Sequence, residues 1–177
     1  MTTLKLAISE SQIQECVGRL AQLIQADYQD QPLLVVLALN GSFVFLSDLI
    51  RHLNLPIQVD FIRLSSYDES SNSSGTVRLH HGVRTSVVDK NVLVVEDIVD
   101  TGLTAQFIRG YFEDQGAATI RICSLLDKPV RRITPVTVDY VGFEVPDEFI
   151  VGYGLDYNQQ YRELRALYSL DGITEGS

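Results

Sequence analysis

The most restrictive feature of this sequence is the segment from Asn91 to Phe112. The apolar run Asn91–Val95 is short enough for a strand buried on both faces, and Ala105–Phe112 has the apolar spacing of a helix. Two adjacent carboxylates and a turn of small residues separate them. In an open α/β sheet such a loop lies at the carboxyl end of a strand, where these sheets hold their ligands. The sequence therefore predicts an α/β fold with a binding loop at about residues 96–104.

The residues of this loop suit a phosphorylated sugar. The turn 100–104 would bring backbone N–H groups to the start of the helix, where a phosphate dianion is stabilised. Glu96 and Asp97 would repel a phosphate, so they predict ribose hydroxyls or a divalent cation beside it. A simpler interpretation makes Asp100 a helix cap and Glu96-Asp97 a solvated strand end. It explains less, because a cap needs one acidic residue and not three.

Strands and helices alternate along the rest of the chain. Helices are predicted at Glu10–Tyr28 and Phe43–Leu53, and strands at Leu33–Leu39, Ile57–Leu64, Thr76–His81, Arg84–Val88, Thr119–Leu126, Val136–Phe143 and Phe149–Tyr153, with a short turn or helix at Asn158–Leu164. This order indicates a mostly parallel sheet with helices on both faces. At 177 residues the chain fits a single domain, 1–177. Residues 65–75, polar and rich in Ser, predict a long flexible loop, and residues 171–177 a frayed tail.

Composition and charge exclude several classes of protein. A formal net charge of −9 argues against a nucleic-acid surface, which needs clustered Lys and Arg. An anionic small substrate can still be held by backbone N–H groups and a few local cations. No apolar stretch approaches the ~20 residues that span a bilayer, and the start of the chain lacks a secretory signal, so we expect a cytoplasmic protein. Cys16 and Cys123 lack the spacing of a metal or redox pair, which predicts reduced core thiols.

Residues 94–104, Val-Val-Glu-Asp-Ile-Val-Asp-Thr-Gly-Leu-Thr, closely resemble the phosphoribosyl-diphosphate signature of the type I phosphoribosyltransferases. The resemblance implies the fold of that family, a mostly parallel α/β sheet flanked by helices, with a small hood element, here at about 144–170, and a flap loop at about 65–75. It also implies that the ribose and its phosphate are bound by Glu96, Asp97, Ile98, Val99, Asp100, Thr101, Gly102, Leu103 and Thr104.

Four further segments resemble the 6-oxopurine branch of the family, the hypoxanthine-guanine phosphoribosyltransferases. Leu39-Asn40-Gly41-Ser42 stands in the place of the diphosphate loop, so Asn40 and Gly41 are implied to bind diphosphate. Ser66 and Tyr67 match the Ser-Tyr of a catalytic flap that closes over the reacting centre and excludes water. Lys128 matches the family lysine that donates to O6 of the purine and so rejects adenine.

The fourth segment, Phe149–Asn158 with Arg162, resembles the family's base-binding and second-metal segment. By this resemblance Phe149 stacks on the purine and Ile150 offers backbone groups to its edge. Asp156 holds Mg²⁺ on the diphosphate beside the purine, and Arg162 clamps the leaving diphosphate.

The activity implied is a step of purine salvage. A phosphoribosyl group would pass from 5-phospho-α-D-ribose 1-diphosphate to N9 of hypoxanthine or guanine, giving IMP or GMP plus diphosphate, with xanthine as a further candidate substrate. Asp100 would accept the proton of the purine N7 or stabilise charge as N9 attacks. Two Mg²⁺ ions, one near Glu96 and Asp97 and one near Asp156, would neutralise the leaving diphosphate. Members of the family are commonly dimers or tetramers, so a homodimer or homotetramer is implied.

Two positions depart from the family pattern, and other functions stay open. Asn40 stands where relatives often carry Lys or Arg, and Leu103 where many carry Lys, so diphosphate binding is expected to depend more on Mg²⁺ and Arg162. A xanthine-preferring enzyme is the nearest alternative. A nucleotide-sensing regulator on the same fold that binds nucleic acid is another, although the acidic charge speaks against it. A catalytically idle binding protein has Asn40 as its only support.

Overall fold

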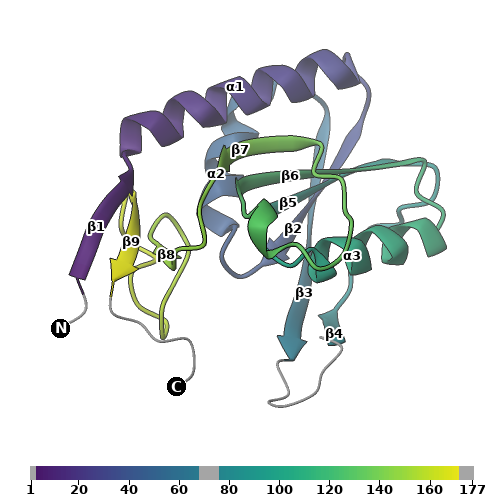
Figure 1. Ribbon diagram of the computed structural model, residues 1–177. Helices are drawn as coiled ribbons and strands as arrows, with labels where there is room; N and C mark the ends of the chain where they lie inside the picture. The colour runs from purple at the N-terminus through teal and green to yellow at the C-terminus, as the bar shows by residue number, and fades with distance from the viewer. Residues whose placement is uncertain (1–2, 68–75, 172–177) are drawn as a thin grey trace.

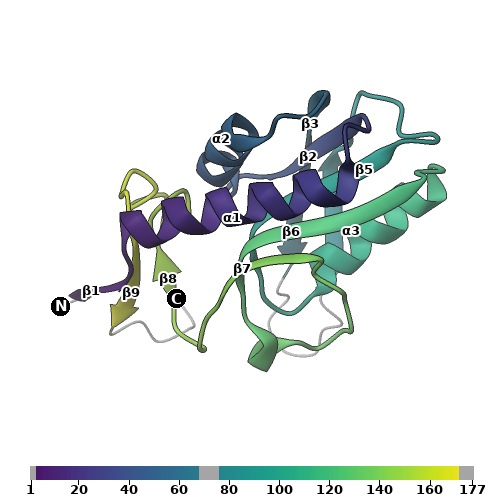
Figure 2. The same ribbon diagram turned by 90° about the horizontal axis from the view of Figure 1, so that it is seen from above.

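A six-stranded sheet forms the body of the protein, and helices cover both of its faces (Figures 1 and 2). The computed structural model describes residues 3–67 and 76–171 of the chain. All neighbouring strands of the sheet are parallel except β3 and β4, which are antiparallel. In spatial order the strands are β4 (Thr76–His81), β3 (Ile57–Tyr67), β2 (Leu33–Leu39), β5 (Asn91–Val99), β6 (Thr119–Asp127) and β7 (Tyr140–Glu144). The predicted mostly parallel α/β sheet is therefore confirmed.

Alternate residues of the central strands face two layers of helices. Leu33 and Val35 of β2 pack in one core with α1 (Glu10–Tyr28) and α2 (Phe43–His52). Leu34 and Val36 pack in the other core with α3 (Leu103–Asp114). Burial on both faces explains why β2 is an unbroken apolar run. Within the described residues, no helix combines the length and the apolar character needed to cross a membrane.

A second, three-stranded sheet lies at one end of the molecule (Figure 1). It joins the two ends of the described chain, because β1 (Thr3–Ile8) pairs antiparallel with β9 (Leu167–Asp171), and β9 pairs with β8 (Ile150–Val151). The sequence predicted neither β1 nor β9. All of β1 except Ile8 is exposed, so it carries little of the apolar signal that predicts a strand.

Several predicted boundaries are wrong, and each has a local cause. The strand predicted at Val136–Phe143 begins only at Tyr140, and the one predicted at Phe149–Tyr153 is confined to β8, since Gly152 has φ +100°. The short turn or helix predicted at Asn158–Leu164 is confirmed as a series of turns. Strand β5 continues past Val95 to Val99 because β6 pairs with it up to that residue. Glu96 and Asp97 therefore sit on the end of a strand, not in a loop.

The predicted flap lies mostly outside the described residues. Ser66 and Tyr67, predicted to open it, belong to the end of β3, where their backbones pair with Val77 and Thr76 of β4. Residues 68–75 fall between the two described ranges, as do 172–177 beyond the second. The flap at 65–75 stays a prediction of the sequence.

Asp60 explains why Arg84–Val88 is not the strand that the sequence predicted. The Asp60 side chain, 8% exposed on β3, accepts hydrogen bonds from the backbone N–H groups of Phe61 (2.8 Å), Arg84 (2.8 Å) and Thr85 (2.7 Å). Backbone N–H groups that donate to a carboxylate cannot also pair with a neighbouring strand. This segment therefore forms only one isolated bridge, at Val88. Burial raises the pKa of Asp60, but the hydrogen bonds from Thr85, Phe61 and Arg84 outweigh it and hold the pKa below its ordinary value.

Replacing Asp60 with Asn is expected to lower the free energy of unfolding at pH 7 by about 2 kcal/mol, because hydrogen bonds to a charged acceptor are lost and an amide NH₂ faces backbone donors. The folded state binds the Asp60 proton less tightly than the unfolded state. The stabilisation is therefore complete above the unfolded pKa of about 4 and disappears as the pH falls through the lower folded pKa. Urea unfolding of both proteins from pH 7 to pH 3 measures this. A stability difference that does not shrink at acid pH would contradict the assignment.

Candidate active site

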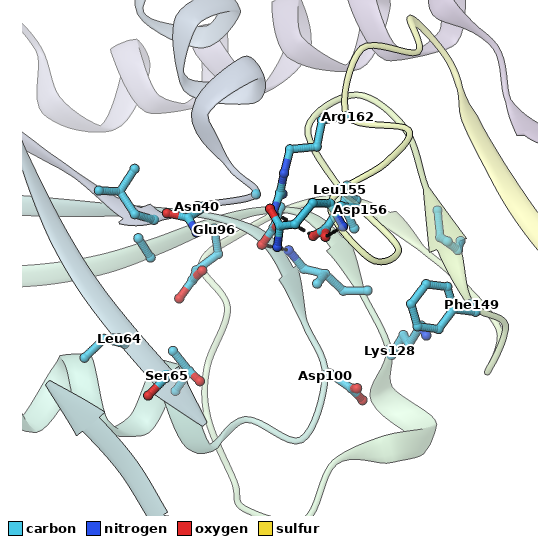
Figure 3. Close-up of a pocket in the computed structure, with 18 of the residues that line it drawn as sticks. Asn40, Leu64, Ser65, Glu96, Asp100, Lys128, Phe149, Leu155, Asp156 and Arg162 are labelled. Atoms are coloured by element: carbon cyan, nitrogen blue, oxygen red, sulfur yellow. Dashed lines mark hydrogen bonds and ion pairs between the residues drawn. The ribbon is translucent and has the colours of Figure 1, made fainter. Parts of the chain in front are cut away.

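A cavity of about 770 Å³ lies at the carboxyl edge of the large sheet (Figure 3). Its walls come from the ends of β2, β3, β5 and β6 and from the segment around β8. They include twelve of the residues proposed from the sequence: Asn40, Gly41, Glu96, Asp97, Ile98, Asp100, Thr104, Lys128, Phe149, Ile150, Asp156 and Arg162. Four of the nine residues implied to bind the ribose and its phosphate, Val99, Thr101, Gly102 and Leu103, do not line it.

Glu96, which is buried, and Asp97, which is half-buried, bring two carboxylates to the end of the central strand. Glu96 is 6% exposed, and its Oε1 has no hydrogen-bond partner. Burial, with the neighbouring charge of Asp97, raises the pKa of Glu96 well above its ordinary value. Burial likewise raises the pKa of Asp97 to about 6, although the N–H of Ile98 donates to its Oδ1 at 2.9 Å. Such groups are stabilised by hydroxyl donors or a cation, so this pair fits the predicted ribose and Mg²⁺.

The donor set matches Mg²⁺ in a particular way. Among the described residues there is no cluster of three or more His, Cys, Asp or Glu side chains able to hold a metal ion. Mg²⁺ is commonly bound by one or two carboxylates together with waters and substrate phosphates, not by a cage of protein groups. Glu96 and Asp97 could supply that number of ligands on one side of the cavity.

The loop after β2 packs tightly against this pair. A Cβ on Gly41 would lie 1.6 Å from Oδ2 of Asp97, so any side chain at this position would displace the carboxylate. A Cβ on Gly154, which has φ +102°, would lie 2.2 Å from the carbonyl oxygen of Gly41. The hydroxyl of Ser42 donates to the carbonyl oxygen of Ala38 and leaves the N-terminus of α2 without a side-chain cap. The predicted diphosphate loop therefore sits directly between Asp97 and the segment at 154.

The signature turn leaves a second helix start without a cap. Gly102, with φ +87°, is the N-cap residue of α3 and makes no side-chain cap hydrogen bond. Asp100 is therefore not the helix cap of the simpler interpretation. Thr104, in the first turn of α3, lines the cavity. Backbone N–H groups at this end suit an anion such as the ribose phosphate.

Asp156 and Arg162 pair with each other on the cavity wall. The Arg162 Nη2 lies 2.8 Å from Oδ1 of Asp156, and Nη1 donates to the carbonyl oxygen of Gly154 at 2.7 Å. The Arg162 guanidinium also donates to Gln159 at 3.2 Å. The positive charge of Arg162 acts to lower the pKa of Asp97, which places a cation near the predicted diphosphate loop. Gln159 was not predicted from the sequence, because a residue in a polar turn carries no local signal.

Lys128 and Phe149 lie together on the opposite side of the cavity from Asn40 and Glu96 (Figure 3). Lys128 follows β6, is 6% exposed, and its Nζ donates to the carbonyl oxygen of Glu148 at 2.6 Å. The Phe149 ring is 37% exposed and meets the ring of Tyr157 edge-on, at 5.5 Å between centroids. An ammonium beside an exposed aromatic face suits a planar base with a carbonyl oxygen.

Asp100 makes an ion pair that the sequence did not predict. Its Oδ1 lies 3.1 Å from Nε of Arg131, which also lines the cavity. Arg131 ends a short 3₁₀ turn, η1 (Pro129–Arg131), directly after Lys128. A basic residue in a loop is usually solvated, so only the fold reveals that Arg131 faces the carboxylate.

The fold is that of an α/β protein with a parallel sheet, and the site at the carboxyl edge of this sheet suits a sugar phosphate and a planar base. Residues 9–158 match the family profile described as "Phosphoribosyl transferase domain". The chain belongs to the phosphoribosyltransferase family.

Individual members of the family align with this chain over most of their lengths. The chain is 43% identical to a hypoxanthine-guanine phosphoribosyltransferase of Bacillus subtilis, across 90% of this chain and 89% of that protein. It is 42% identical to a hypoxanthine phosphoribosyltransferase of Haemophilus influenzae, across 89% of each. The crystal structure of a hypoxanthine-guanine phosphoribosyltransferase from Bacillus anthracis superposes with a TM-score of 0.89 at 43% identity, covering 96% of this chain and 99% of that one.

Proposed function

We propose that this protein is a purine-salvage enzyme that forms IMP or GMP, with release of diphosphate, from phosphoribosyl diphosphate and hypoxanthine or guanine. One observation carries the proposal: a single cavity holds Lys128, Phe149 and Asp100 on one side and the Glu96 carboxylate on the other, and Asp97 also lines it. The relatives with these names share about two fifths of the sequence. A homodimer or homotetramer and a cytoplasmic location stay predictions.

The purine side selects a 6-oxopurine. Lys128 Nζ has three donors, and one is used by the carbonyl oxygen of Glu148, so others can reach O6 of the base. Adenine carries an amino group there, which cannot accept from an ammonium, and a buried donor would be left unpaired. The exposed face of Phe149 stacks on the ring, and the backbone of Ile150 reads its edge.

The ribose and diphosphate side holds the donor substrate. Glu96 and Asp97 accept from the ribose hydroxyls, and the N–H groups at the start of α3 hold the phosphate. The backbone of Asn40 and Gly41, with Arg162, holds the diphosphate. Mg²⁺, when bound through Glu96, Asp97 or Asp156, supplies positive charge against the leaving diphosphate. Because Asn40 is neutral, this side of the cavity depends more on Arg162 and on the metal than it would with a basic residue there.

Asp100 handles the proton. As N9 of the purine attacks C1′ of the ribose, the bond from C1′ to the diphosphate oxygen breaks, and the proton on N7 passes to the Asp100 carboxylate. Its place on the wall beside Lys128 suits a base held through O6. Exclusion of water from the reacting carbon is assigned to the flap, at about 65–75.

The test is nucleotide formation from phosphoribosyl diphosphate with hypoxanthine, guanine, xanthine, adenine and uracil in parallel, with Mg²⁺ and with a chelator. We expect turnover of hypoxanthine or guanine, none of adenine or uracil, and loss of activity in the chelator that added Mg²⁺ restores. Preference for xanthine would favour the xanthine-preferring alternative. No turnover of any base, with salt-dependent retention on nucleic acid, would favour a regulator and overturn the proposal.

A further inference from the structure

Backbone hydrogen bonds connect the loop that follows β6 to the loop that contains Asp100. The N–H of Lys128 donates to the carbonyl oxygen of Val99 at 3.0 Å, and the N–H of Ile133 donates to that of Thr101 at 3.0 Å. These bonds bracket Asp100 on one loop and Arg131 on the other. The backbone of Arg131 is therefore held at a fixed distance from that of Asp100.

The Arg131 side chain joins two carboxylates from separate parts of the chain. Its Nε lies 3.1 Å from Oδ1 of Asp100, and its Nη1 lies 3.3 Å from Oδ1 of Asp147. A guanidinium is planar and presents its donors in a fixed fork, so two carboxylates bound to it are fixed relative to each other. Arg131 is 29% exposed, which limits the competition from water.

Asp147 belongs to the short segment that leads to the base-stacking ring. Its neighbour Glu148 accepts from Lys128 Nζ through its carbonyl oxygen, and Phe149 comes next. Two cations of one loop, Lys128 and Arg131, thus hold the segment 147–149. Through its second ion pair, Arg131 extends this connection to Asp100.

We propose that Arg131 is a positioning residue, which fixes the Asp100 carboxylate relative to the segment that stacks on the purine. This inference rests on the proposed function. Proton transfer in the reacting complex needs the acceptor within hydrogen-bond reach of the base, and displacement by about 1 Å can cost about 100-fold in rate. With Oδ1 held by Arg131, rotation of the carboxylate is restricted, and the acceptor meets the purine in one orientation.

Kinetics of Arg131→Ala and Arg131→Lys test the proposal. In Arg131→Ala, kcat is expected to fall about 10- to 100-fold, with the KM of either substrate changed less than about 3-fold. Arg131→Lys is expected to recover part of the loss, because it restores the charge and not the fork. In a chain that already carries Asp100→Asn, Arg131→Ala is expected to have no further effect on kcat, since Arg131 acts through Asp100.

Arg109→Ala is the matched control. Arg109 is 28% exposed and pairs with Asp139 at 3.4 Å, away from the cavity walls. This control is expected to keep the wild-type kcat. An unchanged kcat in Arg131→Ala, a change in KM alone, or an equal loss in the Asp100→Asn background would each overturn the role assigned to Arg131.

A crystal structure of Arg131→Ala supplies a readout that does not depend on turnover. We expect Asp100 in more than one side-chain orientation, or in one that differs from the wild-type protein. A single unchanged orientation overturns the inference whether or not the wild-type protein turns over any purine. Failure of the proposed function would instead appear as an inactive wild-type protein in the substrate panel.

Discussion

Asp100→Asn is expected to lower kcat for hypoxanthine and guanine by about 10²- to 10⁴-fold, the range contributed by a positioned general base. The amide has nearly the shape of the carboxylate, and its oxygen can still lie beside the Arg131 guanidinium, so the fold of the loop is kept. What is lost is the ability to take a proton from the purine. Steady-state kinetics at saturating phosphoribosyl diphosphate and Mg²⁺ measure the effect, and KM for the purine is expected to change far less than kcat.

The same exchange at Asp114 provides the control. Asp114 is exposed at the end of α3 and lies outside the cavity wall, so Asp114→Asn is expected to keep the wild-type kcat. An Asp100→Asn protein that retained half of the wild-type kcat would remove Asp100 from the chemistry. The proton acceptor would then have to be sought elsewhere on the cavity wall.

Gly41→Ala is expected to lower kcat/KM for phosphoribosyl diphosphate by at least about 100-fold. The new Cβ would stand 1.6 Å from Oδ2 and 2.7 Å from Cγ of Asp97. These are atoms of a side chain, so the carboxylate can turn away and the protein can still fold. A turned carboxylate no longer meets the ribose, and a shifted loop no longer holds the diphosphate. Kinetics with phosphoribosyl diphosphate as the varied substrate, together with urea unfolding, separate this loss from a loss of stability.

Two other glycines serve as comparisons for Gly41. Gly110 lies in α3, and a Cβ added there would have open space within 4 Å, so Gly110→Ala is expected to stabilise the helix by about 1 kcal/mol and leave activity unchanged. Gly154→Ala is expected to lose stability as well as activity, because φ is +102° and the clash is with a backbone oxygen. Full activity in Gly41→Ala would show that Asp97 has no part in binding the donor.

The local hydrophobic pattern predicted the buried helices and strands. It did not predict the strands that form by pairing with residues far away in the sequence. Helix α1 has the predicted bounds and β2 the predicted residues, because each has an apolar pattern that its neighbours along the chain define. β1 escaped prediction because its partner, β9, lies at the other end of the chain: Thr3 pairs with Asp171. Arg84–Val88 was wrongly predicted as a strand, because its local sequence does not show that its N–H groups donate to the Asp60 carboxylate.

The site residues that could be predicted are the charged side chains at the ends of strands. Glu96, Asp97 and Lys128 stand at or just beyond the ends of apolar strands, so a sheet brings them to one edge. Arg131 was not predictable, because its importance comes from two carboxylates, at 100 and 147, that only the folded chain places beside it. The resemblance to a known family named the roles, and the positions of neighbouring strands explain why those residues can share one cavity.

The pairing of β1 with β9 also sets the order in which a growing chain can be completed. During synthesis the first strand leaves the ribosome early, but its partner at Leu167–Asp171 emerges only after every strand of the large sheet has been made. The large sheet can assemble before β1 pairs with β9. A nascent chain halted before residue 167 would therefore contain the residues proposed for the site and lack the small sheet that anchors β8, next to Phe149.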